Sequence, residues 1–232
     1  MIPFRDNIPS RSFPLITVFI IVVNVIVFLY ELALGPHLEP FLFRYGVVPA
    51  AVFAWAESRV PVSAVAVAVP FFTSMFLHGG WLHLIGNMWY LWIFGDNVED
   101  RLGHFTFLVF YLLCGVGAGI VHTILNFNTT VPSIGASGAI AGVLGAYVVS
   151  YPGARVLTLV PIFIFVQIIE IPALIVLGFW FIMQFFYGAA SLAAATANTG
   201  GVAWWAHVGG FLIGMILISL FPRKDRYRYE YH

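Results

Sequence analysis

The chain has 232 residues, of which 61% are hydrophobic and 9% charged, and its mean hydropathy is +0.97. Soluble domains carry about 25% charged residues, so this composition excludes a water-soluble globule and indicates one membrane domain over residues 1–232. The formal net charge is +0, which gives no electrostatic support for nucleic-acid binding. A single cysteine, Cys114, excludes a disulfide framework and a cysteine-based metal site.

Six apolar segments are predicted to cross the membrane as helices, because about 20 apolar residues span the hydrocarbon core. They are residues 12–30, 70–95, 104–124, 137–151, 172–187 and 202–221. Proline is favoured in the first turn of a helix, so Pro70 is expected to begin the second span. Residues 35–60 are expected to form a loop partly in the membrane interface, and 188–201 a linker of small residues. No element is assigned to residues 156–169.

Six spans place both termini on one side of the membrane, and the positive charges indicate which side. Two cations, Arg44 and Arg59, fall in segments on the side opposite the termini. The other eight fall on the side of the termini: Arg5, Arg11, Arg101, Arg155, Arg223, Lys224, Arg226 and Arg228. The sequence therefore predicts an all-α, N-in/C-in bundle with a cytoplasmic N-terminus (1–12) and a basic cytoplasmic tail (222–232).

Four polar residues of the predicted spans lie at a similar depth, in the outer half of the membrane: His83, Asn87, Ser137 and His207. Ionisable groups inside a membrane are costly and indicate function. His83 and Asn87 are four residues apart and share a helix face. His78 precedes His83 by five residues, about 140° around a helix, so we expect it to face elsewhere and make a structural hydrogen bond.

Ser137 lies in the stretch Gly135-Ala136-Ser137-Gly138, where a polar loop gives way to an apolar helix. The first turn of a helix leaves backbone N–H groups unpaired, and these can stabilise an oxyanion. The alternative is that Ser137 only caps the helix and that the glycines only let helices approach.

His207 can reach Ser137 if the fourth and sixth spans pack closely, and small residues recur on one face of each span. These residues are Gly138 and Gly142 on the fourth span, and Ala206, Gly210 and Gly214 on the sixth. A histidine at this distance can accept the serine proton as a general base. No His-Glu-x-x-His string is present, no predicted span has an interior aspartate, and no acidic residue is placed to orient His207, so a Ser–His dyad is favoured over a triad. A zinc site with His83 and His207 would lack a nearby carboxylate or thiolate.

Together these motifs resemble those of the rhomboid intramembrane serine proteases, across all six spans. The matching residues are Gly135-Ala136-Ser137-Gly138, Ala206-His207-Val208-Gly209-Gly210 with Gly214, and His78, His83 and Asn87. The resemblance implies a six-helix bundle in which Ser137 is the nucleophile and His207 the base. It implies an oxyanion hole made by His83, Asn87 and the backbone N–H of Ser137, and a structural role for His78. It also implies no cofactor, and substrates that are single-span membrane proteins, cut in or near the span within the lipid bilayer.

Two features depart from the pattern of that family. Many members carry a Trp-Arg pair in the first loop, and the corresponding place here, Val69-Pro70, has none. Many members also have a tyrosine that stacks on the histidine, where this chain has Ala141. We therefore expect another side chain, or tight packing, to orient His207.

Two other functions remain open from the sequence. One is a non-catalytic relative that captures membrane clients, although such relatives lose the serine or the histidine. The other is a small transporter with His83 and His207 as a proton relay, which predicts repeated half-structures or broken helices. No internal repeat is visible in the sequence. The short N-terminus does not resemble a transit peptide, so a bacterial plasma membrane is the expected location. The substrate and the oligomeric state are left open.

Overall fold

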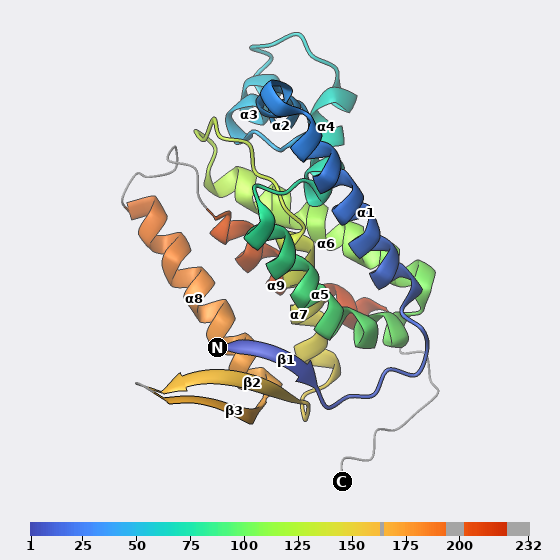
Figure 1. The fold of residues 1–232 in the computed structure, drawn as a ribbon. Coiled ribbons are helices and arrows are strands. Elements are labelled where there is room, and N and C mark those ends of the chain that lie inside the picture. Colours follow the sequence, from blue (N-terminus) through green and yellow to red (C-terminus); the bar gives the residue numbers. More distant parts are fainter. Residues whose placement is uncertain (163–164, 194–201, 222–232) are drawn as a thin grey trace.

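A computed structural model describes residues 1–162, 165–193 and 202–221, and over these ranges the protein is a helical bundle with a small sheet at one end (Figure 1). The main helices are α1 (Leu15–Ala33), α5 (Trp81–Leu102), α6 (His104–Leu125), α7 (Ser137–Ser150), α8 (Ala173–Ala193) and α9 (Trp204–Leu220). Among the described residues, α1, α6 and Ala173–Leu192 of α8 are long and apolar enough to cross a membrane. A bent pair, Ala64–Phe76 with Trp81–Leu102, is a fourth candidate span. The predicted class, a mainly helical membrane protein, is confirmed.

The remaining two predicted spans are the shorter apolar helices α7 and α9. Helix α9 buries one face and exposes Leu212, Ile216 and Leu220, whereas α7 is enclosed by the other helices. Nearly all side chains of α7 are buried, from Gly138 through Tyr147. A helix surrounded by protein on all sides is apolar all round, which accounts for the uninterrupted apolar sequence of α7.

The expected start of the second span at Pro70 is wrong, because Pro70 lies inside α4 (Ala64–Thr73). The start signal of α4 is Ser63, whose Oγ accepts a hydrogen bond from the backbone N–H of Ala66 at 3.2 Å. A short 3₁₀ turn, η2 (Ser74–Phe76), follows, and α5 begins only at Trp81. The two helices meet at an angle of 81°.

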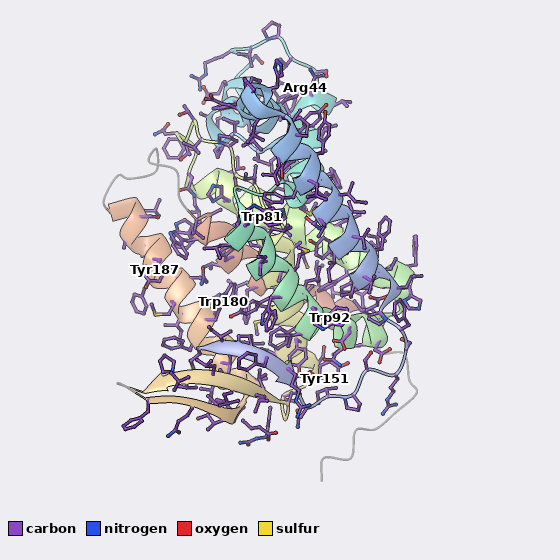
Figure 2. All side chains as sticks on the ribbon, viewed as in Figure 1. Arg44, Trp81, Trp92, Tyr151, Trp180 and Tyr187 are labelled. Carbon is purple, nitrogen blue, oxygen red and sulfur yellow. The ribbon has the colours of Figure 1, made fainter. Side chains whose placement is uncertain are left out.

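Residues 35–60 are not an open loop, as the sequence predicted, but carry a 3₁₀ turn and two short helices. These are η1 (Gly35–His37), α2 (Leu38–Tyr45) and α3 (Pro49–Ala56). They gather with α4 at the end of the molecule opposite the sheet, and Arg44 marks this end in Figure 2.

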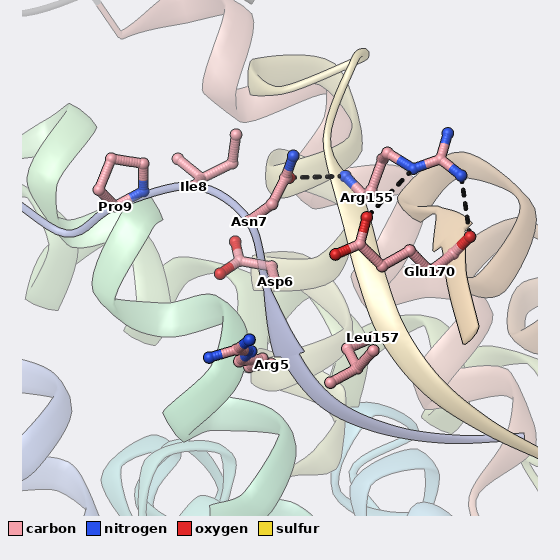
Figure 3. A pocket seen from close by; sticks show the side chains of 8 residues that line it. All are labelled: Arg5, Asp6, Asn7, Ile8, Pro9, Arg155, Leu157 and Glu170. Carbon is pink, nitrogen blue, oxygen red and sulfur yellow. Dashed lines mark hydrogen bonds and ion pairs between the residues drawn. The ribbon is translucent and has the colours of Figure 1, made fainter. Parts of the chain in front are cut away.

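A three-stranded antiparallel sheet, which the sequence did not predict, has the order β1 (Ile2–Asp6), β2 (Arg155–Ile162) and β3 (Phe165–Pro172). The chain thus brings its N-terminus to residues about 150 positions later, and the backbone N–H of Arg155 donates to Asn7 Oδ1 at 2.8 Å (Figure 3). The Arg155 guanidinium donates to the carbonyl oxygen of Glu170 at 2.9 Å. A β-branched, apolar stretch such as residues 165–171 favours a strand.

The start of α1 is held by Glu99, an acidic residue that follows the second predicted span. The Glu99 carboxylate accepts hydrogen bonds from the backbone N–H groups of Ile16 and Thr17 at 2.9 and 2.8 Å, and from Thr17 Oγ1 at 2.7 Å. An acidic group there satisfies free N–H groups and complements the helix dipole. His104 Nδ1 lies 2.5 Å from Glu99 Oε1, the oxygen that accepts from the Ile16 N–H. These contacts tie α1 to α5 and α6.

The predicted linker 188–201 is described only in part, and the predicted tail 222–232 is not described. Residues 188–193 continue α8 rather than forming a linker, while 194–201 and the basic tail 222–232 lie outside the described residues. Pro172 ends β3, and α8 begins at the next residue.

Candidate active site

Ser137 and His207 are in direct contact, as the sequence predicts. Ser137 Oγ lies 2.8 Å from His207 Nε2, a hydrogen-bond distance between residues 70 positions apart in the chain. Ser137 is the first residue of α7, and Ala136 occupies the N-cap position without a side-chain cap. The alternative in which Ser137 is only an N-cap is therefore wrong, because its hydroxyl is bonded to the histidine.

Glycines make this contact possible. A Cβ atom added to Gly210 would overlap the carbonyl oxygen of Gly138, and one added to Gly214 would overlap that of Gly142. The backbones of α7 and α9 thus touch over successive turns, as the small-residue pattern predicts. His207 lies one turn before Gly210 and is carried to the N-terminus of α7.

The start of α7 leaves the backbone N–H groups of its first turn without intrahelical partners. Ile140 is the first residue whose N–H reaches back to the N-cap, bonding to the carbonyl oxygen of Ala136 at 3.0 Å. The N–H of Ser137 is one of the free donors, next to its own hydroxyl. The site thus combines a serine hydroxyl, an imidazole and the positive end of a helix dipole.

His83 lies against the same loop. A Cβ atom added to Gly135 would stand 2.7 Å from both Cε1 and Nε2 of His83 and 3.6 Å from Ser137 Oγ. Gly135 has φ +124°, a backbone conformation that glycine adopts readily. His83 Nδ1 accepts from the backbone N–H of Gly79 at 3.3 Å, which leaves the proton of a neutral ring on Nε2, the atom that faces Gly135.

His78 is not directed elsewhere, as the 140° spacing suggested. It precedes the start of α5 at Trp81, so helical spacing does not apply, and its ring lies 5.1 Å from that of His83. His78 Nε2 is 3.0 Å from Asn87 Nδ2. The His78 backbone N–H donates to the buried Glu31 carboxylate at 3.2 to 3.3 Å. The predicted structural hydrogen bond of His78 is present, and its partner is Asn87.

The residue that sequence reasoning missed is Gln184 of α8. Its Oε1 lies 2.7 Å from His207 Nδ1, on the side of the ring opposite Ser137. Trp180, one turn earlier, packs against the imidazole with ring centroids 5.6 Å apart and planes inclined by 33°. A signal existed, because Gln184 is the one amide in the predicted span 172–187, which has no Asp, Glu, Lys, Arg or His, and polar groups inside membranes are costly.

A cavity of about 30 Å³ adjoins the hydroxyl of Ser137. Its wall includes Gly135, Ser137, Gly138 and Ala206 together with Ser74 and Ser133. This volume is enough for one water molecule, and the walls offer hydroxyl groups to bind it. Among the described residues, no group of three histidine, cysteine or acidic side chains is arranged to hold a metal ion.

Comparison with known proteins shows which family the chain resembles. The family model described as "Rhomboid domain" matches residues 66–224. Rhomboid-like protein 11, chloroplastic, of Arabidopsis thaliana is 32% identical over 66% of this chain and 52% of its own length. The presenilin-associated rhomboid-like protein, mitochondrial, of Bos taurus is 30% identical over 75% of this chain and 47% of its own.

Rhomboid protein 1, mitochondrial, of Saccharomyces cerevisiae is 31% identical over 67% of this chain and 43% of its own length. The chain thus spans about half the length of the curated relatives it matches. The family match covers the candidate site, from His78 on the second predicted span to His207 on the sixth. The chain belongs to the rhomboid family, and it is a multi-pass membrane protein.

Proposed function

We propose that the protein is an intramembrane serine endopeptidase that cleaves transmembrane segments of other membrane proteins with a Ser137–His207 dyad. The observation that carries the proposal is the 2.8 Å contact between Ser137 Oγ and His207 Nε2 at the start of a buried helix. A serine hydroxyl is a weak nucleophile unless an adjacent base takes its proton, and this geometry provides that base.

In the proposed first step, Ser137 Oγ attacks the carbonyl carbon of the scissile peptide bond and its proton passes to His207 Nε2. The carbonyl oxygen becomes an oxyanion beside the N-terminus of α7. The backbone N–H of Ser137 and the Nε2–H of His83 are the donors on that side, and we assign Asn87 to the same group. Donors fixed in a water-poor site stabilise such charge strongly.

The tetrahedral intermediate then collapses, the C–N bond breaks, and His207 gives its proton to the leaving amine. A water molecule hydrolyses the acyl-enzyme by the same steps in reverse order, with His207 as base. The cavity of about 30 Å³ beside Ser137 is a suitable place for this water. The product acid leaves and Ser137 regains its proton.

Six membrane crossings with both termini in the cytoplasm remain a prediction, in which α7 and α9 are short central crossings within one domain over residues 1–232. The location in a bacterial plasma membrane also remains a prediction, and three relatives carry the words mitochondrial or chloroplastic in their names. Fractionation of the cells that encode the chain decides between these membranes.

The competing function is capture of membrane clients without cleavage, since several relatives are named only as rhomboid-like. The hydrogen bond between Ser137 and His207 favours the protease, because a client-binding protein has no need for it. The test is labelling of the purified protein with a fluorophosphonate, in parallel with cleavage of a single-span model substrate. Labelling of wild type and not of Ser137→Ala supports the protease, and a folded chain that neither labels nor cleaves refutes it.

A further inference from the structure

Gln184 is a buried amide on a helix whose other side chains are mostly exposed. It is 7% exposed, whereas its neighbours Phe185 and Phe186 are 45% and 62% exposed. An amide buried in an apolar environment costs free energy unless it is hydrogen-bonded. The partner here is the Nδ1 atom of His207, at 2.7 Å, so the amide is directed into the candidate active site and not into lipid.

The chemistry of this contact fixes which ring nitrogen carries the proton. The carbonyl oxygen of an amide can only accept a hydrogen bond, so His207 Nδ1 must be the donor. A neutral imidazole with its proton on Nδ1 has a free lone pair on Nε2. That lone pair faces Ser137 Oγ at 2.8 Å, which is the arrangement that a general base requires.

Other groups around His207 do not provide this acceptor. His83 and His122 are the titratable neighbours that interact electrostatically with it, and neither is an anion. Among the described residues, no carboxylate is hydrogen-bonded to the His207 ring. Trp180 and Trp204 contact the ring through their aromatic faces and edges, which limits its tilt without selecting a tautomer.

We infer that Gln184 is the positioning residue of the dyad, an amide that holds His207 in the base-competent tautomer in place of an acidic third member. The inference rests on the proposed protease function. Gln184 does not contact the reacting atoms and acts only through His207. Its loss should therefore lower the rate of the chemical step and leave substrate binding unchanged.

The experiment compares Gln184→Met, Gln184→Glu and the control Phe186→Leu in detergent-purified protein. Methionine is similar in length to glutamine and has no strong acceptor, so kcat should fall about 10- to 100-fold with KM unchanged. The fluorophosphonate reaction rate should fall by a similar factor. Phe186→Leu, on the exposed face of α8, should match wild type in both assays.

Gln184→Glu separates positioning from packing. Its carboxylate keeps an acceptor at Nδ1, so labelling should recover to within about tenfold of wild type, and the acid limb of the pH–rate profile should move to higher pH because an anion stabilises the imidazolium. A Gln184→Met protein within twofold of wild type in kcat and labelling overturns the inference. If Gln184→Met does not fold, an unchanged acid limb in Gln184→Glu overturns it. A wild-type protein that neither labels nor cleaves instead refutes the proposed function.

Discussion

Gly214 of α9 packs directly on the carbonyl oxygen of Gly142 in α7, so that no side chain fits between them. Gly214→Ala should therefore force the two helices apart. Overpacking of this kind costs about 1–3 kcal/mol, which corresponds to a fall of several degrees in Tm for a protein of this size. Because the same contact carries His207 to Ser137, protease activity should fall with it. Differential scanning fluorimetry and the cleavage assay give the two readouts.

The matched control is Gly178→Ala in α8, where an added Cβ atom meets no other atom within 4 Å. Alanine is favoured over glycine in a helix, so this variant should be at least as stable as wild type. Equal stability of the two alanine variants would show that the backbones of α7 and α9 do not depend on close contact.

A second prediction concerns the movement of α8. A Cβ atom added to Gly188 would lie 3.3 Å from Cβ of Trp204, close to the spacing of a disulfide. The double variant Gly188→Cys/Trp204→Cys should therefore cross-link α8 to the start of α9. If α8 must move aside to admit a substrate helix, oxidation should slow cleavage of a single-span substrate, and reductant should restore it.

The fluorophosphonate is the internal comparison, because a small reagent needs less opening than a helix. The cross-linked protein should keep the labelling rate of its reduced form. The native Cys114 is buried and should not interfere. Substrate cleavage at equal rates in the oxidised and reduced forms would mean that substrates enter elsewhere.

The features that could be predicted from the sequence are those that depend on the spacing of residues along one helix. Glycines four residues apart indicate a close helix pair whatever the rest of the chain does, and that pair places His207 at Ser137. Gln184 is different, because a single amide in an apolar helix carries no pattern, and its direction depends on how α8 packs on α9. The error over His78 arose because helical spacing was applied to a residue that precedes the helix.

The sheet and the start of α1 show the same limit. From the sequence, Glu99 is only a charge at the end of a span. In the structure it accepts from the backbone N–H groups of Ile16 and Thr17, which lie 83 and 82 positions earlier in the chain. The strand β1 pairs with residues 156–159, a contact set by tertiary structure that short β-rich sequences do not specify.

A third prediction is the orientation of the chain. Single cysteines at Asn128 and Ser10, both exposed, should react with a membrane-impermeant maleimide from opposite sides, with Asn128→Cys labelled from outside. The reason is the excess of cations predicted on the side of the termini. Intact cells and opened membranes provide the two conditions. If both positions are labelled in intact cells, they lie on the same side of the membrane, and the predicted topology of six crossings is wrong.

A fourth prediction concerns Asp6 in β1, outside the membrane-spanning helices. Burial raises the pKa of its carboxyl from 3.8 to about 6, opposed by a hydrogen bond from the Tyr147 hydroxyl. The folded state therefore holds this proton more tightly than the unfolded state, so stability falls as pH rises from about 4 to about 6. Asp6→Asn cannot ionise and should have a higher Tm than wild type at pH 8.

The advantage of Asp6→Asn should shrink as the pH is lowered toward 4, where the carboxyl of wild type is also neutral. The amide introduced by Asp6→Asn keeps an oxygen that can accept from the Tyr147 hydroxyl, so this hydrogen bond is expected to persist in the variant. If the difference in Tm is the same at pH 4 and at pH 8, ionisation of Asp6 is not its cause, and a change in this hydrogen bond is.

The last prediction grades the candidate site residues. Ser137→Ala removes the attacking oxygen and His207→Ala removes the base, so each should lose several orders of magnitude in kcat. Residues that act as one unit are not additive, and the double variant should be little slower than either single variant. Ser137→Ala should also fail to react with a fluorophosphonate.

His83→Ala and Asn87→Ala should behave differently, because each leaves the dyad intact. Loss of one oxyanion donor typically lowers kcat ~10²–10³-fold, so both should retain measurable cleavage and slow labelling. His78→Ala should lower kcat less than Asn87→Ala does, because His78 acts only through the Asn87 amide, which lies 3.0 Å from His78 Nε2. All of these variants should keep a Tm within a few degrees of wild type, which separates chemistry from folding. Cleavage by Ser137→Ala at the wild-type rate would exclude a serine mechanism and reassign these polar residues to client binding.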